Sequence, residues 1–321
     1  MSLETILPFL QPIAHVILDP GVSEVMVNGN GSIFIQRNGT LSSVDAVLES
    51  KYLANAVKRI ARALGNDIGE SKPLLDARLP DGSRVAAAFP PCSLDGVTLT
   101  IRKFRPLWFT MAELVEVGAL PAELAAKLAD GVRNRKTILI AGGTDTGKTT
   151  FAKALIDFIP QHERLGIIED TAELKIDHPN VFRFEARKQQ VDGSGNITVQ
   201  PVTIRDLVKA TLRHRPDRLI IGEVRGGEAF DLLDALNTGH AGSISTVHAN
   251  SAVQALSRMA TLTLRADVDI PYRAVQGEIG DLIDLVIHIE RKERRRRVSE
   301  VLELHRFDAE TGQYETTSLY N

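Results

Sequence analysis

The run that organises the chain reads Ile138-Leu139-Ile140-Ala141-Gly142-Gly143-Thr144-Asp145-Thr146-Gly147-Lys148-Thr149-Thr150. A short apolar segment of β type leads into the pattern G-x-x-x-x-G-K-T, and apolar residues at helical spacing follow it. Glycines let successive backbone N–H groups turn toward one anion, and the start of a helix adds the positive end of its dipole there. The Lys148 ammonium suits the β- and γ-phosphates of ATP, and the Thr149 hydroxyl suits Mg²⁺. A glycine-rich turn without a ligand is the alternative, but the flanking strand and helix argue against it.

Asp145 is the unusual member of this predicted phosphate loop. The predicted nucleotide-binding residues of the loop are Gly142, Gly143, Thr144, Asp145, Thr146, Gly147, Lys148, Thr149 and Thr150. A carboxylate at position 145 stands where a small residue is ordinary. If the side chain points to water its cost is small, whereas a side chain that points inward repels the nucleotide. The sequence leaves both orientations open.

Length and composition limit the class of protein. A chain of 321 residues is long enough for two domains, and 43% hydrophobic with 25% charged residues is ordinary for a globular protein. The net charge of −3 provides no global field for nucleic acid or anionic lipid. The single cysteine, Cys92, excludes an internal disulfide and a multi-cysteine zinc site. Because no apolar run is long enough to span a bilayer and the first residues lack a secretory signal, we expect a cytoplasmic protein, at most peripheral to a membrane.

Two domains and a linker are predicted along the chain. Residues 1–106 read as a small α+β domain, with a hairpin turning at residues 28–31, a helix that ends at Gly65, and strands near residues 77–79, 85–89 and 97–101. Residues 107–120 read as the linker, and residues 121–321 as the second domain. In the second domain, strand-like segments at 165–168, 219–221 and 243–246 alternate with helical patterns at 204–213 and 228–236. This alternation is typical of a parallel sheet, whose ligands lie at the carboxyl ends of the strands.

Acidic residues and histidines gather at those strand ends. Glu169, Asp170 and Glu173 follow the first segment, Glu223 follows the second, and His248 and Asn250 follow the third, which His240 precedes. Any one of these residues alone would be interpreted as a solvated surface group or a satisfied core group. Three strand ends beside one phosphate loop favour a site instead.

Hydrolysis of ATP explains why these residue types would meet. The reaction needs the γ-phosphate charge neutralised and one water aligned for attack. Glu223 can orient that water or accept its proton, and Glu169 could hold a Mg²⁺-bound water or share this role. His248 could sense the γ-phosphate, although a neutral structural hydrogen bond explains it equally well. The candidate catalytic residues are therefore Glu223, Glu169 and Lys148, and the candidate phosphate sensors are His248 and His240.

Four motifs in this order resemble the secretion-ATPase superfamily. They are a Walker A loop (142–149), an acidic box (164–174), an atypical Walker B segment (215–225) and a histidine box (238–250). The resemblance extends back to residues 79–84 and 99–104. Within the superfamily the chain is similar to the TrbB-type conjugal-transfer ATPases of type IV secretion. A single cysteine argues against the type II secretion ATPases, which usually carry a four-cysteine metal module.

The resemblance implies an α/β fold class, with a small α+β N-terminal domain and a RecA-like P-loop ATPase domain whose sheet is mainly parallel. It also implies a homo-oligomeric ring, usually a hexamer, with nucleotide between the two domains and with Arg84 and Arg102 reaching the phosphates from the N-terminal side. Arginine suits this role because its planar fork donates to phosphate bidentately. The implied partners are inner-membrane secretion components, with a peripheral contact at the inner face of the inner membrane and no sequence-specific nucleic-acid binding.

The expected function is an ATP-hydrolysing motor of a conjugation or type IV secretion system, which couples domain motion to pilus assembly or to transfer of DNA or protein. The alternative is a nucleotide-gated assembly factor that binds ATP with little hydrolysis. Asp145-Thr146 favours this alternative, since Gly-Ser is more usual in the family.

Three further features have structural explanations that require no additional function. Residues 291–297, Arg-Lys-Glu-Arg-Arg-Arg-Arg, lie between two alternating apolar runs, which favours a hairpin tip in solvent over a nucleic-acid or lipid contact. The polar residues 187–203 predict a flexible loop. Phe104 either packs in a core or stacks near the adenine.

Overall fold

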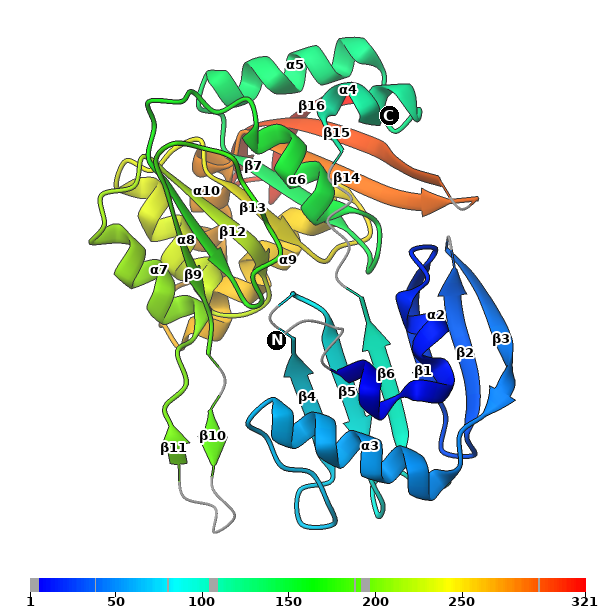
Figure 1. Cartoon of the computed structure of the whole chain (residues 1–321). Helices are drawn as coiled ribbons and strands as arrows, with labels where there is room; N and C mark the ends of the chain where they lie inside the picture. The colour runs from blue at the N-terminus through cyan, green and yellow to red at the C-terminus, as the bar shows by residue number, and fades with distance from the viewer. Residues whose placement is uncertain are drawn as a thin grey trace. The chain divides into compact units, whose positions relative to one another are not determined.

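The computed structural model describes residues 6–37, 39–79, 81–103, 109–187, 189–191, 197–293 and 295–321 (Figure 1). The chain divides into two compact units, Met1–Pro106 and Leu107–Asn321. Phe104 lies outside the described residues, as does the rest of the stretch 104–108 where one unit gives way to the other.

An antiparallel sheet forms the first unit. Its strand order, among the described residues, is β3-β2-β1-β6-β5-β4. The strands are β1 (Val22–Val27), β2 (Ser32–Arg37), β3 (Thr40–Val47), β4 (Leu74–Arg78), β5 (Arg84–Ala88) and β6 (Thr98–Arg102), and the helices are η1 (Leu7–Phe9), η2 (Gln11–Ile13), α2 (Ala14–Leu18) and α3 (Ser50–Ala63). Helix α3 buries Leu53, Val57 and Ile60, which recur at helical spacing and so share the face that packs on the sheet core. The predicted helix is therefore present.

A larger sheet forms the second unit, in the order β16-β15-β14-β7-β13-β12-β8-β9. The strands are β7 (Ile138–Gly142), β8 (Leu165–Glu169), β9 (Val181–Glu185), β12 (Arg218–Val224), β13 (Ile244–Val247), β14 (Leu285–Lys292), β15 (Arg295–Asp308) and β16 (Gln313–Tyr320). Neighbours from β14 to β9 run parallel, and the β14-β15-β16 end is antiparallel. The predicted mainly parallel sheet is confirmed.

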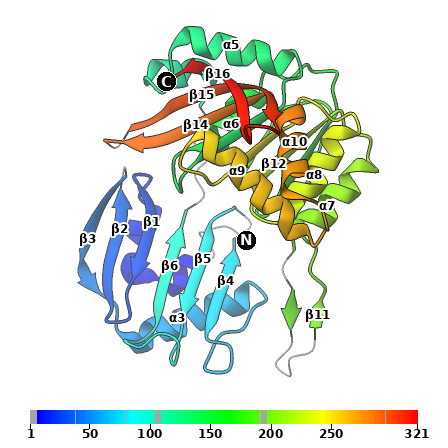
Figure 2. The same cartoon turned by 180° about the vertical axis from the view of Figure 1, so that it is seen from behind.

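Helices cover both faces of this sheet (Figure 1 and Figure 2). They are α4 (Met111–Glu116), α5 (Ala122–Arg133), α6 (Lys148–Ile156), α7 (Ile204–Leu212), α8 (Glu228–Asn237), α9 (Ala252–Thr263), η3 (Leu264–Ala266) and α10 (Tyr272–Leu282). Ile138 and Ile140 of β7 enter the core beneath α4, α5 and α6, whereas Leu139 and Ala141 enter the core beneath α7 to α10. Because both faces are buried, β7 reads as a continuous apolar run from Ile138 to Ala141. No helix in the described parts of the chain has both the length and the apolar character needed to cross a bilayer.

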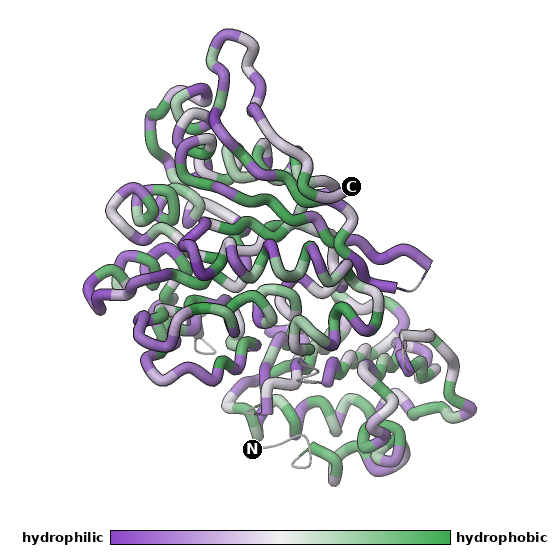
Figure 3. The backbone as a smooth tube through the Cα atoms, turned by 90° about the horizontal axis from the view of Figure 1, so that it is seen from above, coloured by the Kyte–Doolittle hydropathy of each residue, from purple (hydrophilic) through white to green (hydrophobic). Residues whose placement is uncertain are grey.

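Two expected loops contain regular structure. The stretch expected as a linker, 107–120, includes helix α4, which a capping box between Thr110 and Glu113 begins and which buries Met111 and Leu114. The stretch 187–203, expected as a flexible loop, includes the short ribbon of β10 (Gln190–Val191) and β11 (Ile197–Val199). The predicted hairpin around residues 291–297 is present as β14 and β15, and Figure 3 shows the hydrophilic colour of its projecting end at the right.

Candidate functional site

The glycine-rich loop lies between β7 and α6, as predicted. A Cβ on Gly142 would lie 2.4 Å from the Ile289 carbonyl oxygen and 2.7 Å from Thr146 Oγ1, so only glycine fits at the end of β7. Gly147 has a φ of 96° and caps α6, a left-handed conformation that glycine adopts without strain. The Thr146 hydroxyl closes the loop by donating to the Gly143 carbonyl at 3.0 Å.

Lys148 is buried at the first turn of α6, beside Thr149 and Thr150. Its ammonium donates to the carbonyls of Gly142 and Gly143 at 3.1 and 2.8 Å. Burial lowers the pKa of Lys148, and the charge of Glu223 opposes that shift. The Glu223 carboxylate thus favours the charged form of Lys148, although the two residues are far apart in sequence.

Glu223 is half-buried near the end of β12, where Arg225 and His248 contact its carboxylate. Arg225 donates to both oxygens, from Nε to Oε1 at 2.7 Å and from Nη2 to Oε2 at 2.9 Å. His248 Nε2 lies 3.0 Å from Glu223 Oε1. Burial acts to raise the pKa of Glu223, but the hydrogen bonds and charge of Arg225, with the charges of His248 and Lys148, outweigh it and the pKa is lowered. The carboxylate is therefore ionised at neutral pH.

His248 follows β13 and faces the same group of charges. Burial and the charge of Lys148 lower its pKa, and Glu223 acts in the opposite direction. An open pocket of about 640 Å³ adjoins it, lined by Gly143, Thr144, His248, Asn250 and residues of α9 that include Arg258. This volume is within the range of small-molecule sites.

Glu169, at the end of β8, is 3% exposed. Its Oε1 accepts from the backbone N–H groups of Glu173 and Leu174 at 2.7 and 2.8 Å, and Arg183 Nη2 lies 3.4 Å from its Oε2. Burial raises the pKa of Glu169 despite these hydrogen bonds. The carboxylate thus holds the acidic box in shape beneath Gly222, and its predicted help in hydrolysis stays a prediction.

Asp145 has a φ of 60° and meets two arginines of the β14–β15 ribbon. Arg291 Nη1 lies 2.9 Å from Asp145 Oδ2, and Arg296 Nη2 lies 2.6 Å from Asp145 Oδ1. The sequence predicted that this ribbon ends in a tip in solvent. The structure differs in part, because Arg291 and Arg296 contact Asp145 of the glycine-rich loop.

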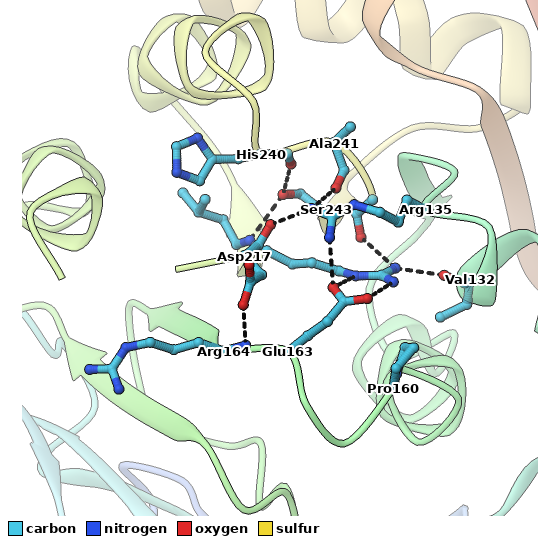
Figure 4. Close-up of polar contacts among 12 residues, drawn as sticks. Val132, Arg135, Pro160, Glu163, Arg164, Asp217, His240, Ala241 and Ser243 are labelled. Atoms are coloured by element: carbon cyan, nitrogen blue, oxygen red, sulfur yellow. Dashed lines mark hydrogen bonds and ion pairs between the residues drawn. The ribbon is translucent and has the colours of Figure 1, made fainter. Parts of the chain in front are cut away.

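A buried polar cluster lies at the other end of β12 (Figure 4). Arg218 is 0% exposed and donates to Glu163 through Nε at 2.6 Å and Nη2 at 2.7 Å. Arg135 Nη1 adds a contact to Glu163 Oε2 at 3.1 Å. His240 belongs to this region, since its Nδ1 lies 2.9 Å from the Ala235 carbonyl oxygen and its own carbonyl accepts from Ser243 Oγ. The sensing role predicted for His240 stays a prediction. The histidine that contacts the Glu223 carboxylate is His248.

Arg84 and Arg102 belong to the first unit. They lie directly opposite each other on β5 and β6, so their side chains share one face of that sheet. The two arginines predicted to bind phosphate are thus neighbours on adjacent strands of the first unit.

The comparison with known proteins decides the family. A model of the family described as type II/IV secretion system protein matches residues 9–312. The chain belongs to this family. Among its type II/IV secretion relatives, the probable conjugal transfer protein TrbB of Sinorhizobium fredii is 34% identical over 94% of this chain and 88% of its own length. The predicted resemblance to TrbB-type proteins is confirmed.

Two solved structures share the fold. The VirB11 ATPase of the Brucella suis type IV secretion system, in complex with sulphate, is 29% identical, with 94% of each chain covered and a TM-score of 0.50. The Legionella pneumophila ATPase DotB is 19% identical over 97% of this chain and 82% of its own, with a TM-score of 0.63, and supports the fold alone.

Three arginines that contact the site residues of this type II/IV secretion family member were not predicted from the sequence. Arg225 was quoted within the Walker B segment without a role, although a residue two positions from Glu223 in extended backbone faces the same side. Arg291 and Arg296 were noticed only as part of a charged run, since nothing in that run names Asp145 as their partner.

Proposed function

We propose that the chain is a Mg²⁺-dependent ATPase that acts as the motor of a conjugation or type IV secretion system. The observation that carries the proposal is the placement of three side chains beside the glycine-rich loop: Lys148 begins α6, Glu223 is near the end of β12, and His248 follows β13. His248 Nε2 lies 3.0 Å from Glu223 Oε1, and the Glu223 carboxylate favours the charged form of Lys148. Membership of the type II/IV secretion family supports the setting, and the ionised state of Glu223 supports the chemistry.

Each residue of the loop has a role in this proposal. The backbone from Gly142 to Gly147 surrounds the phosphates, and Lys148 exchanges its carbonyl partners for the β- and γ-phosphates. Glu223 orients the attacking water, Glu169 assists by shaping the acidic box, and His248 registers the γ-phosphate through its contact with Glu223. Thr144, Asp145, Thr146 and Thr150 complete the binding loop.

Magnesium fits the donors that the loop offers. The described residues contain no cluster of three or more His, Cys, Asp or Glu side chains that could hold a metal on its own. Mg²⁺ commonly takes only one or two protein ligands and completes its shell with phosphate oxygens and water. The Thr149 hydroxyl would supply one ligand, and the ion would neutralise charge on the phosphates.

The proposal extends to assembly and location. Following the family resemblance, we propose a homo-oligomeric ring, a hexamer, at the cytoplasmic face of the inner membrane, with secretion-system components as partners and without sequence-specific binding to nucleic acid. Arg84 and Arg102 are included as phosphate contacts from the same or a neighbouring subunit. The cargo would be pilus subunits, DNA or protein.

Phosphate release from ATP and Mg²⁺, measured for the wild type and for Glu223→Gln, tests the activity. We expect the variant to lose at least about a hundredfold in kcat while ADP affinity stays within about threefold, because positioning of water contributes to the chemical step. Asp234→Asn on the exposed side of α8 removes one charge elsewhere and should leave kcat unchanged. Unchanged turnover in Glu223→Gln would overturn the proposed role of Glu223.

A nucleotide-gated switch is the second candidate, and two observations favour it. Asp145 brings a carboxylate to the loop, and Arg225 holds both oxygens of Glu223. Tight ADP binding with no turnover in the wild type would support the switch and exclude the motor.

A further inference from the structure

Asp145 is fixed to the β14–β15 ribbon by three contacts. Besides the two ion pairs with Arg291 and Arg296, Arg296 Nε donates to the Asp145 backbone carbonyl at 3.0 Å. The Asp145 side chain is 36% exposed, against 31% for Arg291 and 53% for Arg296. Both arginines therefore hold the Asp145 carboxylate, and Arg296 also holds the backbone of the loop.

The register of the sheet explains why these arginines reach the loop. Strand β14 runs parallel to β7, and Ile289 pairs with Gly142, where β7 ends. The ribbon continues past that point, so Arg291 projects alongside the loop, and Arg296 lies directly opposite Arg291. Opposed residues share one face of a ribbon. The other face carries a separate pair, Arg297 with Glu290 at 2.7 Å.

The loop geometry accommodates the contact. A Cβ at Gly147 would lie 3.2 Å from Cδ of Arg296, so this arginine lies across the loop where α6 begins. The positive φ of Asp145 is a conformation that aspartate, asparagine and glycine adopt more readily than other residues.

We propose that the face of the β14–β15 ribbon that carries Arg291 and Arg296 is part of the nucleotide site, and that these two arginines are positioning residues that neutralise Asp145 and hold the phosphate loop open to an anion. This inference rests on the proposed nucleotide binding. Without the arginines, the Asp145 carboxylate would stand uncompensated beside the phosphates and repel them. With them, the group of three side chains carries a net positive charge. The carboxylate thus tethers the ribbon to the loop instead of blocking it.

Charge removal in two steps tests the proposal. In Arg291→Gln/Arg296→Gln, the affinity for a fluorescent ADP should fall on the order of tenfold, because one nearby charge is left unpaired at a partly screened site. Adding Asp145→Asn should restore most of that affinity, since asparagine keeps the shape and the positive φ but carries no charge. Arg297→Gln on the opposite face is the matched control and should bind within about twofold of the wild type.

Hydrogen exchange in the nucleotide-free protein provides a second readout. Asp145→Asn should speed amide exchange in peptides that cover the end of β14 and the start of β15, because the tether is lost. A loss of ADP affinity that persists in the triple variant would overturn the proposal, as would no loss in the arginine double variant or unchanged exchange. Absence of ADP binding by the wild type would overturn the proposed function and this inference together. If the wild type binds ADP but Asp145→Asn lowers the affinity of the arginine double variant further, only the inference is overturned.

Discussion

Glu163→Gln should destabilise the second unit strongly, although it changes one carboxylate to an amide far from the phosphate loop. Arg218 is completely buried, and besides its two bonds to Glu163 it donates to the Val132 carbonyl at 2.6 Å. An amide can accept at its oxygen only, so one guanidinium N–H would face the NH₂ group of glutamine. The substitution also removes the counter-charge of a guanidinium that water does not reach.

Breaking a buried ion pair by removing one partner costs roughly 3–5 kcal/mol. The Glu163 side chain is 5% exposed, so solvent screening reduces that cost little. For a unit of this size, such a loss lowers the melting temperature by roughly 6–20 °C. Arg218 holds the pKa of Glu163 below its usual value, so the stability that the pair provides is present above about pH 4.3 and is lost as the pH falls through the lowered pKa.

Differential scanning calorimetry and urea unfolding measure the effect. Glu123→Gln is the control, because Glu123 is 80% exposed and pairs with Lys127 one helical turn away. It should leave the melting temperature and the urea midpoint nearly unchanged, because solvent screens an exposed ion pair. The reasoning would be refuted if Glu163→Gln lowered the free energy of unfolding by less than about 1 kcal/mol. It would also be refuted if the variant lost stability at acid pH in the same way as the wild type.

Two further substitutions test the environment of the loop and the titration of the core. Gly142→Ala should reduce ADP affinity more than about tenfold and lower the free energy of unfolding by about 1–3 kcal/mol, because its Cβ would lie 2.4 Å from the Ile289 carbonyl oxygen. Gly277→Ala is the control, because a Cβ there would meet open space. Wild-type ADP affinity in Gly142→Ala would contradict the structure. Burial lowers the pKa of His288, so the unfolded chain binds more protons and stability should rise with pH up to about 6.5. His288→Gln should flatten that rise in urea midpoints, and an unchanged slope would exclude His288 as its source.

The sequence was sufficient for the central architecture of the second unit. Strands β7, β8 and β12 are buried on both faces over most of their length, so each contains a short run of apolar residues and glycine that polar residues follow. The strand–loop–helix order, with the acidic residues at the strand ends, then led to the prediction that Lys148 and Glu223 belong to one site. Local pattern and tertiary environment agree in these elements.

Elements at the margins of the sheet could not be predicted in the same way. Strand β16 is exposed along most of its length and carries no apolar alternation, and helix α4 has only six residues, so its buried Met111 and Leu114 form too short a pattern. The partners of Asp145 depend on the pairing of Ile289 with Gly142, which brings together residues more than 140 positions apart. Sequence patterns within one segment do not predict the register between strands so far apart in the chain.

The hydrogen bonds from Lys148 to the carbonyls of Gly142 and Gly143 have a consequence for the speed of ligand capture. The ammonium is already immobilised, so an arriving anion exchanges one set of bonds for another without first freezing a floppy side chain. The entropic penalty of association at this position is therefore small. Encounter should be limited by diffusion through the opening and departure by how readily the ammonium returns to its two carbonyls.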